Sequence, residues 1–102
     1  MVEIVKGTTP TLQFTFDSID PSTISTAILT IKCRNTIVLR KELNEATVTS
    51  SAISWTLTQA ETLGINGLTE VVANWLTTGG VRGVSKRSDV RFTSNPIEEV
   101  IS

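Results

Sequence analysis

The chain has 102 residues, 39% of them hydrophobic, with a formal net charge of −1, one cysteine and no histidine. This length suits one hydrophobic core, so we expect a single domain over residues 1–102. The missing histidine removes the commonest general base and transition-metal ligand, and a lone cysteine excludes an internal disulfide and a cysteine-based zinc site, so we expect neither an enzyme nor a cofactor.

Apolar and polar residues alternate along most of the chain, which is typical of strands with one buried face and one wet face. In the first half this pattern predicts a short edge strand over Val2–Lys6 and a clear strand over Thr11–Phe16. A longer strand is predicted over Ser25–Arg34. The tight turn Asn35-Thr36 then leads into Ile37–Glu42, which completes a hairpin.

The middle of the chain contains the one clear interruption of this period. Thr47–Thr49 and Ala52–Leu57 are two further β segments, which the pattern also allows to be one bent strand. Thr58 and Glu61 then form a capping box, a hydroxyl and a carboxylate placed to accept the free amides of a helix start. We expect a single helical turn that ends at Gly64.

Alternation resumes near residue 71 and continues almost to the end. Gly79-Gly80 supplies a hairpin loop, and Val84–Thr93 is the returning strand. Its inward side chains are predicted to be Ser88, Val90 and Phe92. About seven short strands with turn signals between them predict an immunoglobulin-like antiparallel β-sandwich with one short helical turn. The predicted core comprises Leu12, Phe14, Leu29, Ile31, Trp55, Val71, Trp75 and Val90.

Acidic residues suggest little catalytic chemistry. The pairs Glu42/Glu45 and Glu98/Glu99 are interpreted as solvated surface, since general acid–base catalysis needs positioned carboxylates with shifted pKa values. Asp17 and Asp20 lie in a polar segment without the spacing and glycine of a calcium loop, so turn formation is the preferred interpretation. No metal site is therefore predicted.

Basic residues and the cysteine also have structural interpretations. A basic cluster near the last hairpin is predicted to be a solvated face that could meet acidic residues of a neighbouring subunit; its members are Arg82, Lys86, Arg87 and Arg91. It lacks the exposed aromatic residues of a nucleic-acid site. Cys33 falls on the apolar side of its strand and is predicted to be a buried, inert thiol.

Three apolar side chains fall on faces that the alternation predicts to be wet: Ile28, Val72 and Leu76. Scattered singly on the surface they would need no explanation. Clustered on neighbouring strands they would form a patch that another copy or a partner covers. The sequence leaves both alternatives open, and these residues are the candidate interaction surface.

Three stretches together resemble a known group of proteins. Ile4–Pro10 leads into Leu12-Gln13-Phe14 as a glycine-threonine opening strand, and Trp55–Leu63 is similar to an "LTQ-x-ET" turn. Gly83–Val90 resembles a closing hairpin. On these segments the chain resembles small β-sandwich tail and baseplate proteins of phages and prophages of Gram-positive bacteria, similar to the N-terminal domain of upper baseplate proteins.

The resemblance implies a non-enzymatic structural component of a phage tail or baseplate, acting through protein–protein docking. It implies that the partners are other phage tail proteins or copies of the chain, and that the location is the virion after synthesis in the bacterial host cytoplasm. We expect no nucleic acid, membrane or small-molecule substrate as a partner, and the first residues lack the apolar run of a signal peptide. The alternative function is a free-standing carbohydrate- or ligand-binding β-sandwich module.

Overall fold

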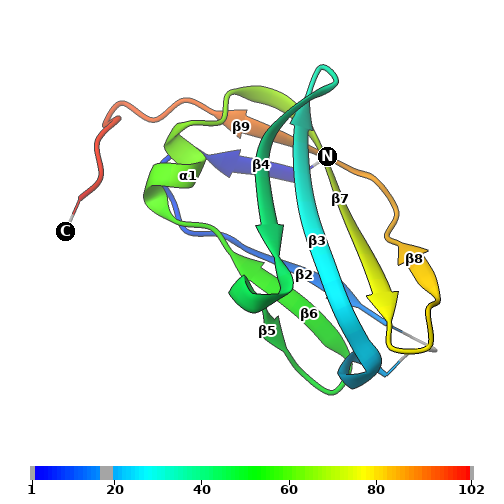
Figure 1. The fold of residues 1–102 in the computed structure, drawn as a ribbon. Coiled ribbons are helices and arrows are strands. Elements are labelled where there is room, and N and C mark those ends of the chain that lie inside the picture. The colour runs from blue at the N-terminus through cyan, green and yellow to red at the C-terminus, as the bar shows by residue number, and fades with distance from the viewer. Residues whose placement is uncertain (1, 17–19, 102) are drawn as a thin grey trace.

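The computed structural model describes residues 2–16 and 20–101 of the chain. These residues form an all-β sandwich of two packed sheets with one short α-helix, which confirms the predicted fold class (Figure 1). The strands in this part of the chain are β1 (Val2–Val5), β2 (Thr11–Thr15), β3 (Ile24–Cys33), β4 (Thr36–Glu42), β5 (Thr47–Val48), β6 (Ala52–Thr56), β7 (Gly67–Thr77), β8 (Arg82–Val84) and β9 (Ser88–Thr93). The helical elements are α1 (Gln59–Leu63) and the 3₁₀ turns η1 (Pro21–Thr23) and η2 (Leu43–Glu45).

The larger sheet has the strand order β1-β9-β7-β3-β4, with β8 beside β7, and the smaller sheet has the order β2-β6-β5. Two features extend the expected topology. The described residues contain nine strands rather than about seven, since β5 and β8 are only two and three residues long. The edge strand β1 pairs in parallel with β9, while the other pairs are antiparallel.

The core lies between the two sheets, where the alternating side chains of both layers meet. Leu29 and Ile31 of β3 are fully buried, and Trp55 of β6 is 1% exposed. Of the predicted core, Leu29, Ile31, Trp55, Val71 and Val90 are buried, and Leu12, Phe14 and Trp75 are partly buried against them. The period of two therefore assigned the inner faces correctly.

Tight hairpins position the central strands of the larger sheet. Between β3 and β4, Arg34 and Asn35 have φ angles of 52° and 69°. Positive φ at both central residues is typical of the two-residue type I′ turn, whose twist matches that of the flanking strands. Between β7 and β8, Gly80 has a φ of 84°. The second turn lies where it was predicted, whereas the first lies at Arg34-Asn35, one residue before the predicted Asn35-Thr36, because Thr36 already belongs to β4. The first turn aligns β4 with β3, and the second aligns β8 with β7.

Two predicted segments differ in detail. The two β segments predicted over residues 47–57 are separate strands, β5 and β6, which pair as an antiparallel hairpin, so the alternative of one bent strand is wrong. The predicted strand Val84–Thr93 is divided, because at Ser85 the side-chain hydroxyl takes the place of a carbonyl and accepts the Ala73 amide at 2.9 Å. Beyond this break Ser88 stands opposite the buried Val71, on the same face as Val90 and Phe92 as predicted, but it is exposed whereas Val90 and Phe92 are buried.

Candidate interaction surface

The three predicted surface residues lie together on the outer face of the larger sheet. Ile28 of β3 stands opposite Asn74 of β7. Along β7, Val72 and Leu76 flank Asn74 on the same face, since side chains two residues apart point the same way. Ile28 and Val72 are half-buried, and Leu76 is 39% exposed. The sequence left open whether these residues adjoin, and the strand register brings them together.

A fourth apolar residue joins them from β8. Val84 pairs with Asn74 on the side opposite Ile28 and is 58% exposed. Ile28, Val72, Leu76 and Val84 therefore surround Asn74, and we call these four the outer apolar patch. Alternation in the sequence does not assign Val84 to this face, because a three-residue strand is too short to show which side chains point outward.

Charged residues border the outer apolar patch on both sides. On β4, the Arg40 Nη2 atom lies 3.6 Å from the Glu42 Oε1 atom, and both side chains are exposed. On β8, Arg82 donates a hydrogen bond from Nη2 to the Asn74 Oδ1 atom at 3.3 Å. Between these borders lies a shallow hollow of about 230 Å³, lined by Thr26, Ile28, Asn74, Trp75, Leu76 and Arg82. Apolar side chains grouped around one amide, with charged groups at their border, fit the apolar core and polar rim of a protein–protein interface.

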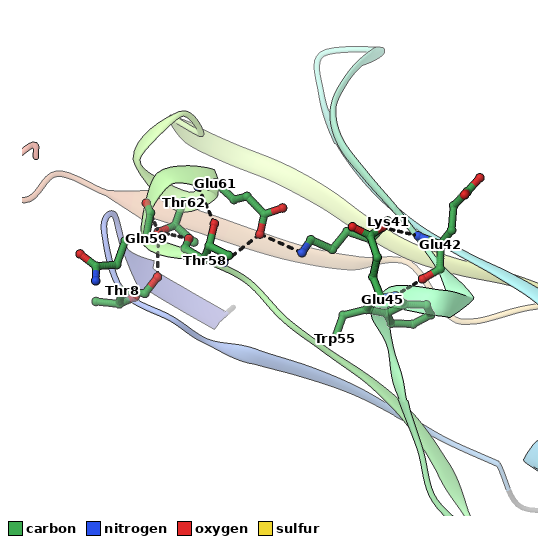
Figure 2. Close-up of polar contacts among 9 residues, drawn as sticks. All are labelled: Thr8, Lys41, Glu42, Glu45, Trp55, Thr58, Gln59, Glu61 and Thr62. Atoms are coloured by element: carbon green, nitrogen blue, oxygen red, sulfur yellow. Dashed lines mark hydrogen bonds and ion pairs between the residues drawn. The ribbon is translucent and has the colours of Figure 1, made fainter. Parts of the chain in front are cut away.

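The capping box at α1 is formed as predicted, and it continues into an ion pair (Figure 2). The Thr58 hydroxyl accepts the Glu61 amide at 3.2 Å, and Glu61 Oε1 accepts the Thr58 amide at 2.8 Å. The same Oε1 lies 2.9 Å from Nζ of Lys41, which is buried on β4. Burial opposes ionisation of Glu61, but the Thr58 amide and the Lys41 ammonium outweigh it and lower its pKa.

Neighbouring polar groups in Figure 2 also have structural partners. The Thr62 side chain is fully buried, and its hydroxyl accepts a hydrogen bond from the Gly7 amide at 2.9 Å. The same hydroxyl donates to the Thr8 carbonyl oxygen at 2.8 Å, so the two bonds join α1 to the connection between β1 and β2. Trp55 donates from Nε1 to the Glu42 carbonyl at 3.0 Å. This network therefore supplies the hydrogen bonds that join α1, β4 and β6, and no substrate is needed to explain it.

The acidic residues singled out in the sequence lie apart. Glu45 accepts the Glu42 amide at 3.0 Å, and Glu98 lies 3.9 Å from the Lys6 ammonium. Asp20 accepts the Ser22 amide at 2.9 Å, which lowers its pKa and caps η1, while Asp17 lies outside the described residues. Across residues 2–16 and 20–101, no three His, Cys, Asp or Glu side chains gather into a possible metal site.

The predicted basic cluster is spread over the sheet rather than gathered. Arg87 lies 3.5 Å from Glu70, and Arg91 stands between Glu3 and Leu68 in the strand register. Cys33, which was predicted to be buried, is half-buried at the end of β3. These positions form no concentrated basic surface. The outer apolar patch is therefore the candidate site that the geometry favours.

No protein-family model matches the chain, and no curated protein is similar enough to count as a relative. In the part of the chain that the structure describes, no helix combines the length and apolar character that crossing a membrane requires.

Proposed function

We propose that this chain is a non-enzymatic structural component that acts by docking the outer face of its larger sheet onto another protein. The observation that supports the proposal is the arrangement of the outer apolar patch. Four apolar side chains surround Asn74 on three neighbouring strands, with Arg40, Glu42 and Arg82 at the border. Apolar side chains gathered on neighbouring strands, with charged groups at their border, are typical of a face that a partner covers.

The setting we propose is the tail or baseplate of a phage or prophage, and it comes from the resemblance of three segments. The polar groups that resemble the family's turn are engaged in capping and ion pairing, as expected of an assembly part without a reaction centre. In this setting the docking partners are other tail proteins or further copies of the chain.

The aromatic residues favour docking over sugar binding. Carbohydrate modules present exposed aromatic rings for stacking on sugar rings, whereas the five aromatic residues of this chain are buried or half-buried. Phe14 packs edge-to-face on Trp55 with ring centroids 5.8 Å apart, and Phe16 packs similarly on Trp75 at 4.8 Å. These rings stabilise the sandwich and leave the face of the larger sheet to aliphatic and charged groups.

A binding experiment with face variants tests the proposal. The purified products of the neighbouring genes are mixed with wild type and with Leu76→Lys and Val72→Lys, and complexes are measured by size-exclusion chromatography with light scattering. We expect a complex that both lysine variants weaken at least tenfold, because each places a charge in the apolar centre. Gln13→Lys, on an exposed position of β2 in the other sheet, is the matched control and leaves the complex intact.

Three results would contradict the proposal. A complex that resists both lysine substitutions would place the docking elsewhere. Retention of the chain on a glycan array without any protein partner would support the carbohydrate-binding alternative. A gene neighbourhood without tape-measure, tail-fibre or lysin genes would remove the tail assignment.

A further inference from the structure

We propose that the partner of the outer face is the same face of a second copy of this chain, in a two-fold dimer whose axis runs parallel to β3 and β7. This inference rests on the proposed docking function and names the partner. It follows from the positions of charged residues on either side of the outer apolar patch, which are complementary when two copies are stacked face to face.

The symmetry follows from the strand order. Across the outer face, four columns of side chains follow one another: β4, β3, β7, and then β8 together with β9. A two-fold axis between β3 and β7 exchanges the inner columns and lays β4 of one copy over β8 and β9 of the other. A two-fold interface is self-complementary only if these outer columns match in charge.

The first charge match joins β4 to β8. Glu42 of β4 pairs with Ile28 of β3, and Ile28 pairs on its other side with Asn74 of β7. Glu42 therefore lies at the same height along the strands as Asn74. Arg82 pairs with Leu76, two residues further along. The offset is therefore two residues, about 6.6 Å along a strand. An extended arginine side chain spans that distance.

The second match joins β4 to β9 with the charges reversed. Arg40 stands opposite Thr30, which stands opposite Val72. Asp89 pairs with Glu70, two residues before Val72. The offset again is about 6.6 Å. Each copy thus contributes both partners of both pairs, and the two-fold axis doubles them to four.

Few contacts within one chain compete with these pairs, and the Arg82 guanidinium has a hydrogen bond only to Asn74 among the described residues. Arg82 and Asp89 have no ion-pair partner within residues 2–16 and 20–101. Arg40 and Glu42 pair only with each other, and their side chains are 55% and 62% exposed. Electrostatic pairing at a rim sets register and partner choice more than affinity.

The face is also large enough for a specific interface. Four strand columns about 4.8 Å apart, along the 11-residue β7 with a rise of about 3.3 Å per residue, span roughly 700 Å². A standard interface buries about 600–1,000 Å² from each partner. One sheet face therefore suffices for a dimer, with the outer apolar patch at its centre.

Charge reversal tests the arrangement. In a dimer of the Glu42→Arg variant, the new arginine of each copy would face Arg82 of the other copy. In a dimer of the Arg82→Glu variant, the new glutamate of each copy would face Glu42 of the other copy, so like charges meet in both cases. We expect wild type to have twice the 11.0 kDa mass of one chain in sedimentation velocity at high concentration. We expect each variant alone to be monomeric there, with a dimer dissociation constant raised at least tenfold.

Mixing the two variants gives the decisive measurement. In a mixed dimer both symmetry-related contacts again join an arginine to a glutamate, so the dimer is expected to return when the variants are combined in equal amounts. The pair Arg40→Asp and Asp89→Arg repeats the test at independent positions, should Glu42→Arg disturb the neighbouring turn η2. Glu99→Arg makes the same change in charge on the exposed C-terminal segment and is expected to leave the dimer unchanged.

Three outcomes overturn the inference. Variants that still dimerise alone would place the dimer on another face, and singly monomeric variants that fail to dimerise when mixed would refute the pairing. A monomeric wild type would refute self-docking but leave the proposed function standing if tail-protein binding is still lost in Leu76→Lys. A charge-dependent dimer that binds no tail protein would support the inference and remove only the proposed docking to other tail proteins.

Discussion

Replacing Trp55 by alanine should remove a large part of the stability of the sandwich. The side chain is 1% exposed, packs edge-to-face on Phe14, and donates a hydrogen bond to the Glu42 carbonyl. An aromatic side chain of this size buries up to about 250 Å², worth about 6 kcal/mol at 25 cal/mol per Å². Alanine retains part of that, so we expect Trp55→Ala to lower the free energy of unfolding by about 3–5 kcal/mol.

Chemical denaturation followed by circular dichroism measures this loss, which is a large fraction of the roughly 5–15 kcal/mol typical of a domain. Trp55→Phe separates packing from hydrogen bonding. It keeps an aromatic ring but leaves the Glu42 carbonyl without its donor, and about 1–3 kcal/mol of the loss should remain. If Trp55→Ala unfolds within about 1 kcal/mol of wild type, Trp55 is not the centre of this core.

Three further predictions follow from local contacts. Because the pKa of Glu61 is lowered in the folded state, its ionised form stabilises the protein above the unfolded value of about 4.3, and this contribution is lost as pH falls through the folded pKa. Thermal melts should therefore show Glu61→Gln less stable than wild type at pH 7, with a difference that shrinks below about pH 4; a constant difference would contradict the ion pair. Gly83→Ala should lower the free energy of unfolding by more than about 1 kcal/mol, as overpacking of a core does, because its Cβ atom would overlap the Trp75 indole. Gly79→Ala is the matched control: its Cβ atom would meet only ordinary contacts, so chemical denaturation should show a much smaller loss. Because the chain lacks histidine and has one cysteine, elemental analysis of the purified protein should find no stoichiometric transition metal, and one zinc or iron per chain would refute the expected absence of a metal site.

Much of the fold was predictable because its signals are local. Alternation depends on residues two apart, and it assigned Leu29, Ile31 and Trp55 to the core correctly. The capping box depends on residues three apart, so Thr58 and Glu61 could be assigned before any tertiary contact was known. The break at Ser85 was not predictable, because it arises when a hydroxyl group meets the backbone of Ala73 on another strand.

The sequence by itself determined that this is a single β-sandwich, which side of each long strand faces the core, and where its helical turn begins. Only the tertiary structure decided which strands adjoin and in what register. Ile28 and Leu76 are 48 positions apart by number, and their adjacency depends on the pairing of β3 with β7. The position of Val84 depends likewise on the hairpin that returns β8 along β7. A surface patch is a property of cross-strand neighbours, and hydrophobic periodicity carries no information about those neighbours.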